Sequence, residues 1–201
     1  MNYLLDNLPT EIDGIKIDTD YRRMVQFELL MFDEAVPPAD KIKLAINLLY
    51  REPILSVEDA WSGLLKYYSV DEKMLEKGQN NGSTIMRAYD FEKDHERIYV
   101  AFLQVYKIDL QKEALHWYTF KALLQALPDD CLMGKLMYYR TCDISRLSKD
   151  EQNVAREIRK KFPTTKTNKS MTKAQREAEF LARIDKRQKE VEKIMAERGK
   201  R

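Results

Sequence analysis

The sequence predicts an all-α protein: a helical bundle of several short to medium helices with a possible short N-terminal β-ribbon and an extended C-terminal helix. Two observations predict it. The 201 residues include only six Gly and six Pro but 34% charged residues, which disfavours the many turns of a sandwich or barrel. Apolar residues also recur at helical spacing along most of the chain, and a hydrophobic content of 44% is enough to bury a core.

The N-terminal unit, residues 1–68, is predicted to open with a β-ribbon and to continue as three helices. Residues 11–17 alternate in polarity around Asp13-Gly14, a dipeptide typical of hairpin turns. Helix-capping residues and prolines then favour helices at about 18–34, 39–50 and 57–68. The first has Asp18 to Asp20 as candidate N-caps, and the third has Ser56 with Asp59 three residues later.

Residues 69–88 are predicted to be a linker or exposed loop, because the polar stretch contains Gly78 and Asn81-Gly82 and has no sustained period. Beyond it, residues 89–162 are predicted to hold a helical hairpin and two further helices, near 132–139 and 149–161. We expect this part to form one compact body with residues 1–68.

The hairpin spans residues 89–127, with a turn near Ile108 to Leu110. Helical spacing gives each arm a buried face. The two faces contain Ile98, Phe102, Val105 and Tyr106, and Trp117, Phe120, Leu124 and Leu127. The predicted structural core is Phe102, Tyr106, Leu115, Trp117, Phe120 and Leu124.

Residues 163–201 are predicted to be a basic linker followed by an amphipathic helix at about 172–198. Its narrow apolar stripe has the a and d spacing of a helix that packs against a partner. The predicted partner-binding residues are Leu181, Ile184, Val191 and Met195.

The composition also bears on location. No apolar run reaches the roughly 18 residues that cross a bilayer, and the first residues lack the basic region of a signal peptide. Cys131 and Cys142 are too few and too isolated for a disulfide scaffold or a zinc site. These features predict a cytoplasmic protein without contact to membranes.

The net charge of +2 is the sum of two parts with opposite charge: the chain from Arg156 onward is strongly basic, and the part before it is acidic. The basic residues between Arg156 and Lys173 could neutralise phosphates, so a nucleic-acid-binding protein with a basic C-terminal arm is one alternative. Acidic residues alternate with basic ones in the last helix, which instead favours a solvated helix or one that faces a partner protein.

Two Glu-x-x-His units, Glu92 with His95 and Glu113 with His116, suggest a more remote alternative, a di-metal helical-bundle protein. Such a site also needs carboxylates from two other helices, for which Glu28 and Glu58 are candidates. Helix electrostatics accounts for the acidic residues without a metal. His116 lacks a Ser or Cys nucleophile at a recognisable spacing, so we expect it to be a packed core residue. No catalytic residue and no cofactor is predicted.

A set of hydrophobic and aromatic residues resembles a family of small proteins encoded in the tail gene clusters of siphophages that infect Gram-positive bacteria. The resemblance covers roughly residues 1–160, and Tyr118 departs from it where a second Trp is expected. The residues that carry it are Leu8-Pro9-Thr10-Glu11, Ile15, Ile17, Asp20-Tyr21-Arg22, Tyr89-Asp90-Phe91-Glu92, Tyr106, Ile108, Asp109, Leu110, Leu115, His116, Trp117, Phe120, Leu123, Leu124, Leu127 and Tyr139-Arg140.

The resemblance implies a tail assembly chaperone, which is not an enzyme. Its expected client is the tape measure protein, a long helical rod that must stay soluble until the tail assembles. The family also implies a longer form, made by ribosomal frameshifting, that recruits the tail tube protein. A chaperone of this type would act in the host cytoplasm and be absent from the mature virion.

Overall fold

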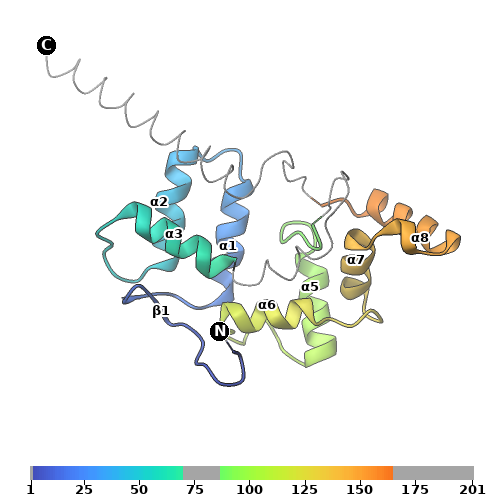
Figure 1. Ribbon diagram of the computed structural model, residues 1–201, viewed down its shortest axis with the longest axis horizontal. Coiled ribbons are helices and arrows are strands. Elements are labelled where there is room, and N and C mark those ends of the chain that lie inside the picture. Colours follow the sequence, from blue (N-terminus) through green and yellow to red (C-terminus); the bar gives the residue numbers. More distant parts are fainter. Residues whose placement is uncertain (1, 70–86, 165–201) are drawn as a thin grey trace, which may run out of the picture.

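The computed structural model describes residues 2–69 and 87–164 of the chain (Figure 1). Within these residues the protein is mostly α-helical with one small two-stranded sheet, so the all-α prediction and the β-ribbon are confirmed. The predicted C-terminal helix, with Leu181, Ile184, Val191 and Met195, lies outside the described residues. No described helix has the length and apolar character needed to cross a membrane.

The ribbon pairs β1 (Glu11–Ile12) with β2 (Ile15–Lys16) in antiparallel register. Its turn is formed by Asp13 and Gly14, which both have positive φ (50° and 80°), as the Asp-Gly dipeptide predicts. The ribbon lies close to helix α3 (Val57–Tyr68) at Gly63, where a Cβ atom would meet the Ile12 side chain. A glycine is therefore required for this close approach.

Three N-terminal helices follow, at the predicted places: α1 (Tyr21–Phe32), α2 (Pro38–Leu49) and α3 (Val57–Tyr68). The Asp20 carboxylate caps α1 by accepting from the Arg22 amide, and Ser56 Oγ caps α3 by accepting from the Asp59 amide. Pro38 begins α2, where its missing N–H has no cost. Helix α2 contacts both α1 and α3.

Residues 89–127 do not form the simple helical hairpin that the sequence predicts. Helix α5 (His95–Ala101) continues as a π-helix, η2 (Phe102–Tyr106), which ends at Lys107 in the left-handed conformation (φ 59°). A loop then leads to α6 (Trp117–Gln125). Helix α6 contacts α1, whereas α5 contacts α7 (Leu132–Thr141), so the two arms pack against different helices. A π-helix has hydrogen bonds from residue i to i+5 and so breaks the α-helical spacing of side chains. The spacing of apolar residues in the sequence could not reveal this change.

The last described elements are the 3₁₀ turn η3 (Ile144–Arg146) and α8 (Lys149–Lys161), which packs on α7. Helix α8 begins with a capping box, in which Ser148 Oγ accepts from the Glu151 amide and the Glu151 carboxylate accepts from the Ser148 amide. Helices α7 and α8 also lie where the sequence predicts them.

One hydrophobic cluster runs from Ile17 to Met133 and includes residues from both sides of the 69–88 stretch. Phe120 lies at its centre, stacked on Tyr21 (4.4 Å between ring centroids) and on Phe102 (5.0 Å). Of the six predicted core residues, Phe102, Trp117, Phe120 and Leu124 are at most 1% exposed, while Tyr106 and Leu115 are half-buried. Aromatic contacts across α1, η2 and α6 therefore hold the two halves of the described chain together.

Candidate functional site

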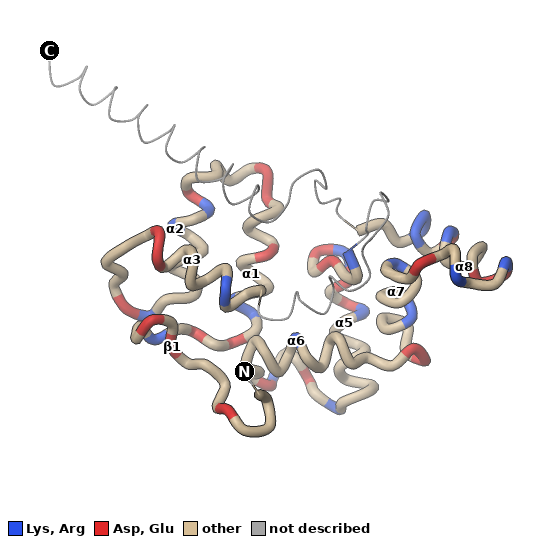
Figure 2. The backbone as a smooth tube through the Cα atoms, in the orientation of Figure 1, with Lys and Arg blue, Asp and Glu red and all other residues tan. Residues whose placement is uncertain are grey.

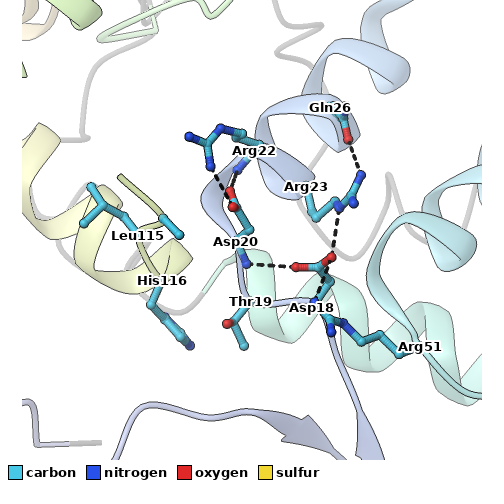
Figure 3. Close-up of a pocket in the computed structure, with 10 residues that line it drawn as sticks. Asp18, Thr19, Asp20, Arg22, Arg23, Gln26, Arg51, Leu115 and His116 are labelled. Atoms are coloured by element: carbon cyan, nitrogen blue, oxygen red, sulfur yellow. Dashed lines mark hydrogen bonds and ion pairs between the residues drawn. The ribbon is translucent and has the colours of Figure 1, made fainter. Parts of the chain in front are cut away.

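A cleft of about 410 Å³ lies between the start of α1 and the segment that precedes α6 (Figure 3). Its lining is unusually rich in charged side chains. It consists of Asp18, Thr19, Asp20, Arg22, Arg23, Gln26, Arg51, Ala114, Leu115 and His116. This volume is in the range of small ligand pockets.

The floor of the cleft is a pair of antiparallel backbone segments. The Tyr21 amide donates to the Leu115 carbonyl (2.9 Å), and the Trp117 amide donates to the Thr19 carbonyl (2.8 Å). These bonds join the first residues of α1 to the first residues of α6, so the N-termini of the two helices meet here. The cleft is consequently fixed by the backbone rather than by side chains alone.

His116 is the N-cap of α6, and both of its ring nitrogens are used. Its Nδ1 accepts from the Tyr118 amide (3.1 Å), so the proton lies on Nε2, which donates to the Pro9 carbonyl (2.9 Å). Burial lowers the pKa of His116, although the bond to Pro9 acts in the opposite direction. In this arrangement both nitrogens are engaged by backbone groups, so His116 positions the helix.

Asp18 organises the charged wall of the cleft. Its Oδ2 accepts from Arg23 Nε (3.0 Å) and forms an ion pair with Arg51 Nη2 (3.2 Å), and its Oδ1 accepts from the Asp20 amide (3.2 Å). Burial raises the pKa of Asp18, but the Asp20 amide and the two guanidinium groups together outweigh it and lower the pKa. Asp18 therefore stays ionised, and its carboxylate lies between Arg23 and Arg51, as Figure 3 shows.

Arg22, by contrast, has its polar groups committed to the fold. Its Nη1 donates to Asp20 (2.7 Å), and its Nη2 donates to the carbonyls of Leu110 (2.7 Å) and Glu113 (3.0 Å). The Tyr21 hydroxyl donates to the same Leu110 carbonyl (2.8 Å). Arg22 thus fastens the loop before α6 to α1.

With His116 neutral, three arginines face two aspartates, which leaves the cleft one net positive charge. Among the described residues, Arg23 Nη2 and the Nε and Nη1 groups of Arg51 have no hydrogen-bond partner. The arrangement can bind an anion, and the described lining holds no Ser or Cys nucleophile. The sequence indicates Asp18 and Asp20 as helix caps, and Asp20 also belongs to the residues that carry the family resemblance, but nothing in the sequence connects Arg51 with them.

Residues 4–163 of the chain match the family described as Bacteriophage Gp15 protein. The chain belongs to this bacteriophage family. The match includes every residue of the cleft and all the described helices. Neither a curated protein nor a solved structure matches the chain significantly.

In this Gp15 family member the Glu-x-x-His units do not have the geometry of a di-metal bundle. Glu92 and Glu113 both precede the helices on which they were expected, and His95 and His116 lie at the starts of α5 and α6. Glu28 is buried and accepts from Tyr68 and Arg87. No group of three or more His, Cys, Asp or Glu in the described part of the chain is arranged to hold a metal ion.

The basic run begins within the described residues, on α8. Arg159 there has a structural role, because it donates to the carbonyls of Tyr139 (2.9 Å) and Cys142 (2.7 Å) at the end of α7. Arg156 donates to Asn153 and Gln152 on its own helix. The rest of the run, from Lys166, lies outside the described residues.

Proposed function

We propose that this Gp15 family member is a tail assembly chaperone that binds the tape measure protein and keeps it soluble, without catalysis. The proposal places it in the host cytoplasm during assembly and not in the mature virion. A frameshifted longer form would recruit the tail tube protein. Membership of a bacteriophage family supports a role in phage production, and the chaperone role itself rests on the resemblance to tail gene products and on an exposed apolar patch.

The observation that carries the proposal is this apolar patch, which consists of Val100, Leu103 and Leu132. Their exposed fractions are 39%, 40% and 58%. Val100 and Leu103 are three residues apart on α5 and η2, so they share a helix face. Large aliphatic side chains exposed together suit the apolar face of an amphipathic helix, the structure expected of a tape measure rod.

Leu132 lies at the same end of the α5–α7 pair. Asp94, just before α5, is ion-paired with Arg140 near the end of α7, so the two contacting helices run antiparallel. This direction brings the start of α7, at Leu132, toward the end of α5, where η2 begins. The three side chains can then be covered by one partner helix.

Co-expression with the tape measure protein from the same tail gene cluster tests the proposal. The wild-type chain should raise the soluble yield of this client and be purified with it. A variant with Val100→Ser, Leu103→Ser and Leu132→Gln should lose most of this effect. Leu55→Gln is the matched control, because Leu55 is fully exposed but lies in the α2–α3 loop, away from the patch.

Salt dependence distinguishes this role from nucleic-acid binding. An apolar contact should survive moderate salt, whereas a basic arm with about five phosphate contacts would lose several hundred-fold in DNA affinity between about 50 and 200 mM salt. Tight, salt-sensitive DNA binding with no effect on client solubility would contradict the proposal. Equal client yields with the wild type and the triple variant would show that the patch is not the binding surface.

A further inference from the structure

The arginine pair in the cleft keeps N–H donors that its contacts with Asp18 and Gln26 do not use. Arg23 is held by Asp18 and also by Gln26, whose Oε1 accepts from Arg23 Nη1 (3.2 Å). Arg51 is held by the same Asp18 carboxylate. Because both guanidinium groups are already oriented, a ligand that binds them orders few additional side-chain rotations.

Donors remain for such a ligand. The side chains of Arg23 and Arg51 are 41% and 64% exposed, and each has N–H groups without a partner in the described part of the chain. The planar fork of a guanidinium group matches the two oxygens of a carboxylate. Figure 3 shows the two groups reaching the Asp18 carboxylate from opposite directions.

The electrostatics favour a singly charged ligand. Asp18 and Asp20 lie among the arginines, so the lining has only one excess positive charge. A polyanion such as DNA would be repelled by both carboxylates, and the cleft offers no continuous row of basic residues for its phosphates. In Figure 2 the Lys and Arg residues of α8 lie at the opposite end of the molecule from α1 to α3, so they do not extend the cleft.

We propose that the cleft between α1 and the start of α6 is a second interaction site, which binds an acidic side chain of a partner peptide at the N–H groups of Arg23 and Arg51 that Asp18 and Gln26 do not use. The guanidinium groups donate to the carboxylate oxygens, and the half-buried Leu115 contacts the aliphatic part of the same side chain. This site is separate from the apolar patch on α5 and α7. It requires neither the tape measure protein nor the chaperone role.

The test uses the full chain and two acetylated, amidated peptides, Gly-Gly-Glu-Gly and Gly-Gly-Gln-Gly. Binding is followed by NMR through the Nε–Hε signals of the arginines. We expect the Glu peptide to bind at least about tenfold more tightly than the Gln peptide, as charge-assisted hydrogen bonds imply. The signals that move should include those of Arg23 and Arg51.

Arg51→Gln should weaken binding of the Glu peptide by about tenfold or more. Arg51→Lys keeps the charge but loses the planar set of guanidinium donors, so it should weaken binding by less. Arg51 is largely exposed, so both variants should fold, which thermal melting can verify. Arg146→Gln is the matched control, because Arg146 is 85% exposed in an ion pair with Asp143 on η3. It should leave binding unchanged.

Three results would overturn the proposal: equal affinity for the two peptides, no shift with either peptide, or an Arg51→Gln variant that binds as well as the wild type. Binding of a short DNA duplex that is tighter than peptide binding and is lost in Arg51→Gln would assign the cleft to phosphate instead. None of these results depends on client solubility. A negative result here therefore leaves the chaperone proposal untouched, and a negative result for the chaperone proposal leaves this one untouched.

Discussion

Asp94 and Arg140 form a buried, two-pronged ion pair that joins α5 to α7. Arg140 Nη1 lies 2.6 Å from Asp94 Oδ2, Nη2 lies 3.1 Å from Oδ1, and the two side chains are 1% and 0% exposed. Arg140 also donates to the carbonyls of Ala88 and Phe162 (both 3.1 Å), and Asp94 accepts from the Asp90 amide (3.0 Å). Each charge is therefore compensated by several partners.

Removing one member of this pair should be strongly destabilising. Asp94→Ala leaves the Arg140 charge buried without its carboxylate, which should lower the free energy of unfolding by about 3–5 kcal/mol. Urea unfolding measures this. The double variant Asp94→Leu with Arg140→Met should be more stable than Asp94→Ala, since no uncompensated charge remains. A double variant less stable than the single one would mean that the hydrogen bonds to Ala88 and Phe162 carry the stability.

The sequence was sufficient for those elements whose ends are fixed by neighbouring residues. Asp20, Ser56 and Ser148 cap the helices that follow them, and the Asp13-Gly14 turn closes the ribbon. Each of these signals acts over two to four residues, so local spacing is enough to predict it.

Non-local contacts could not be predicted in this way. Asp94 and Arg140 are 46 residues apart, and each resembles an ordinary surface residue in the sequence. The cleft combines Arg51 with residues near positions 18–26 and 114–116, which are brought together only when α1 meets α6. His116 was expected to be a packed core residue, yet it is a half-buried helix cap. This role could not be predicted, because a histidine that caps a helix has no distinct sequence pattern.

Trp117 should contribute strongly to stability through packing. It is 1% exposed and stacks on Tyr68 (5.6 Å) and Phe120 (6.0 Å). Trp117→Ala should cost about 3–5 kcal/mol through lost burial and a cavity. Trp117→Phe is the comparison variant. It keeps an aromatic ring at this site, and the Trp117 Nε1 that it removes has no partner within the described structure, so it should cost less than Trp117→Ala. Equal losses in the two variants, measured by urea unfolding, would contradict this account.

His116 should make stability depend on pH. Because its pKa is lower in the folded state, the unfolded chain takes up a proton first as the pH falls. Its contribution is complete above about pH 6.5 and is lost as the pH falls from there toward the lowered pKa. His116→Asn keeps a good N-cap but does not titrate. The variant should therefore lose less stability than the wild type between about pH 7.5 and 5.5, a window above the carboxylate titrations. Equal losses would exclude His116 as the cause.

The last prediction concerns Glu28, a buried carboxylate on α1 that holds both ends of the undescribed stretch 70–86. It accepts from the Tyr68 hydroxyl, at the end of α3, and from the Arg87 guanidinium, where the described chain resumes. Lys121 adds a further tie, since its Nζ donates to the Tyr68 carbonyl (3.1 Å). The residues on either side of the stretch are thus fixed to the core independently of what lies between them.

Replacing residues 70–86 with about eight Gly and Ser residues should therefore preserve the fold. Tyr68 and Arg87 reach the same carboxylate, so their backbones lie within the span of about 26 Å that eight extended residues cover. Halving the length of a loop changes its closure free energy by only about 0.6 kcal/mol. Thermal melting and the arginine NMR signals of the shortened chain should match those of the wild type.

Glu28→Ala is the contrasting variant. It leaves the largely buried Arg87 and the Tyr68 hydroxyl without their shared acceptor, and it should cost about 3 kcal/mol or more in the wild-type chain. If Glu28 is what holds the two ends, the same substitution should cost a similar amount in the shortened chain. A shortened chain that unfolds although Glu28 is intact would show that residues 70–86 themselves contribute to the core, and that the two ends are not held by this carboxylate alone.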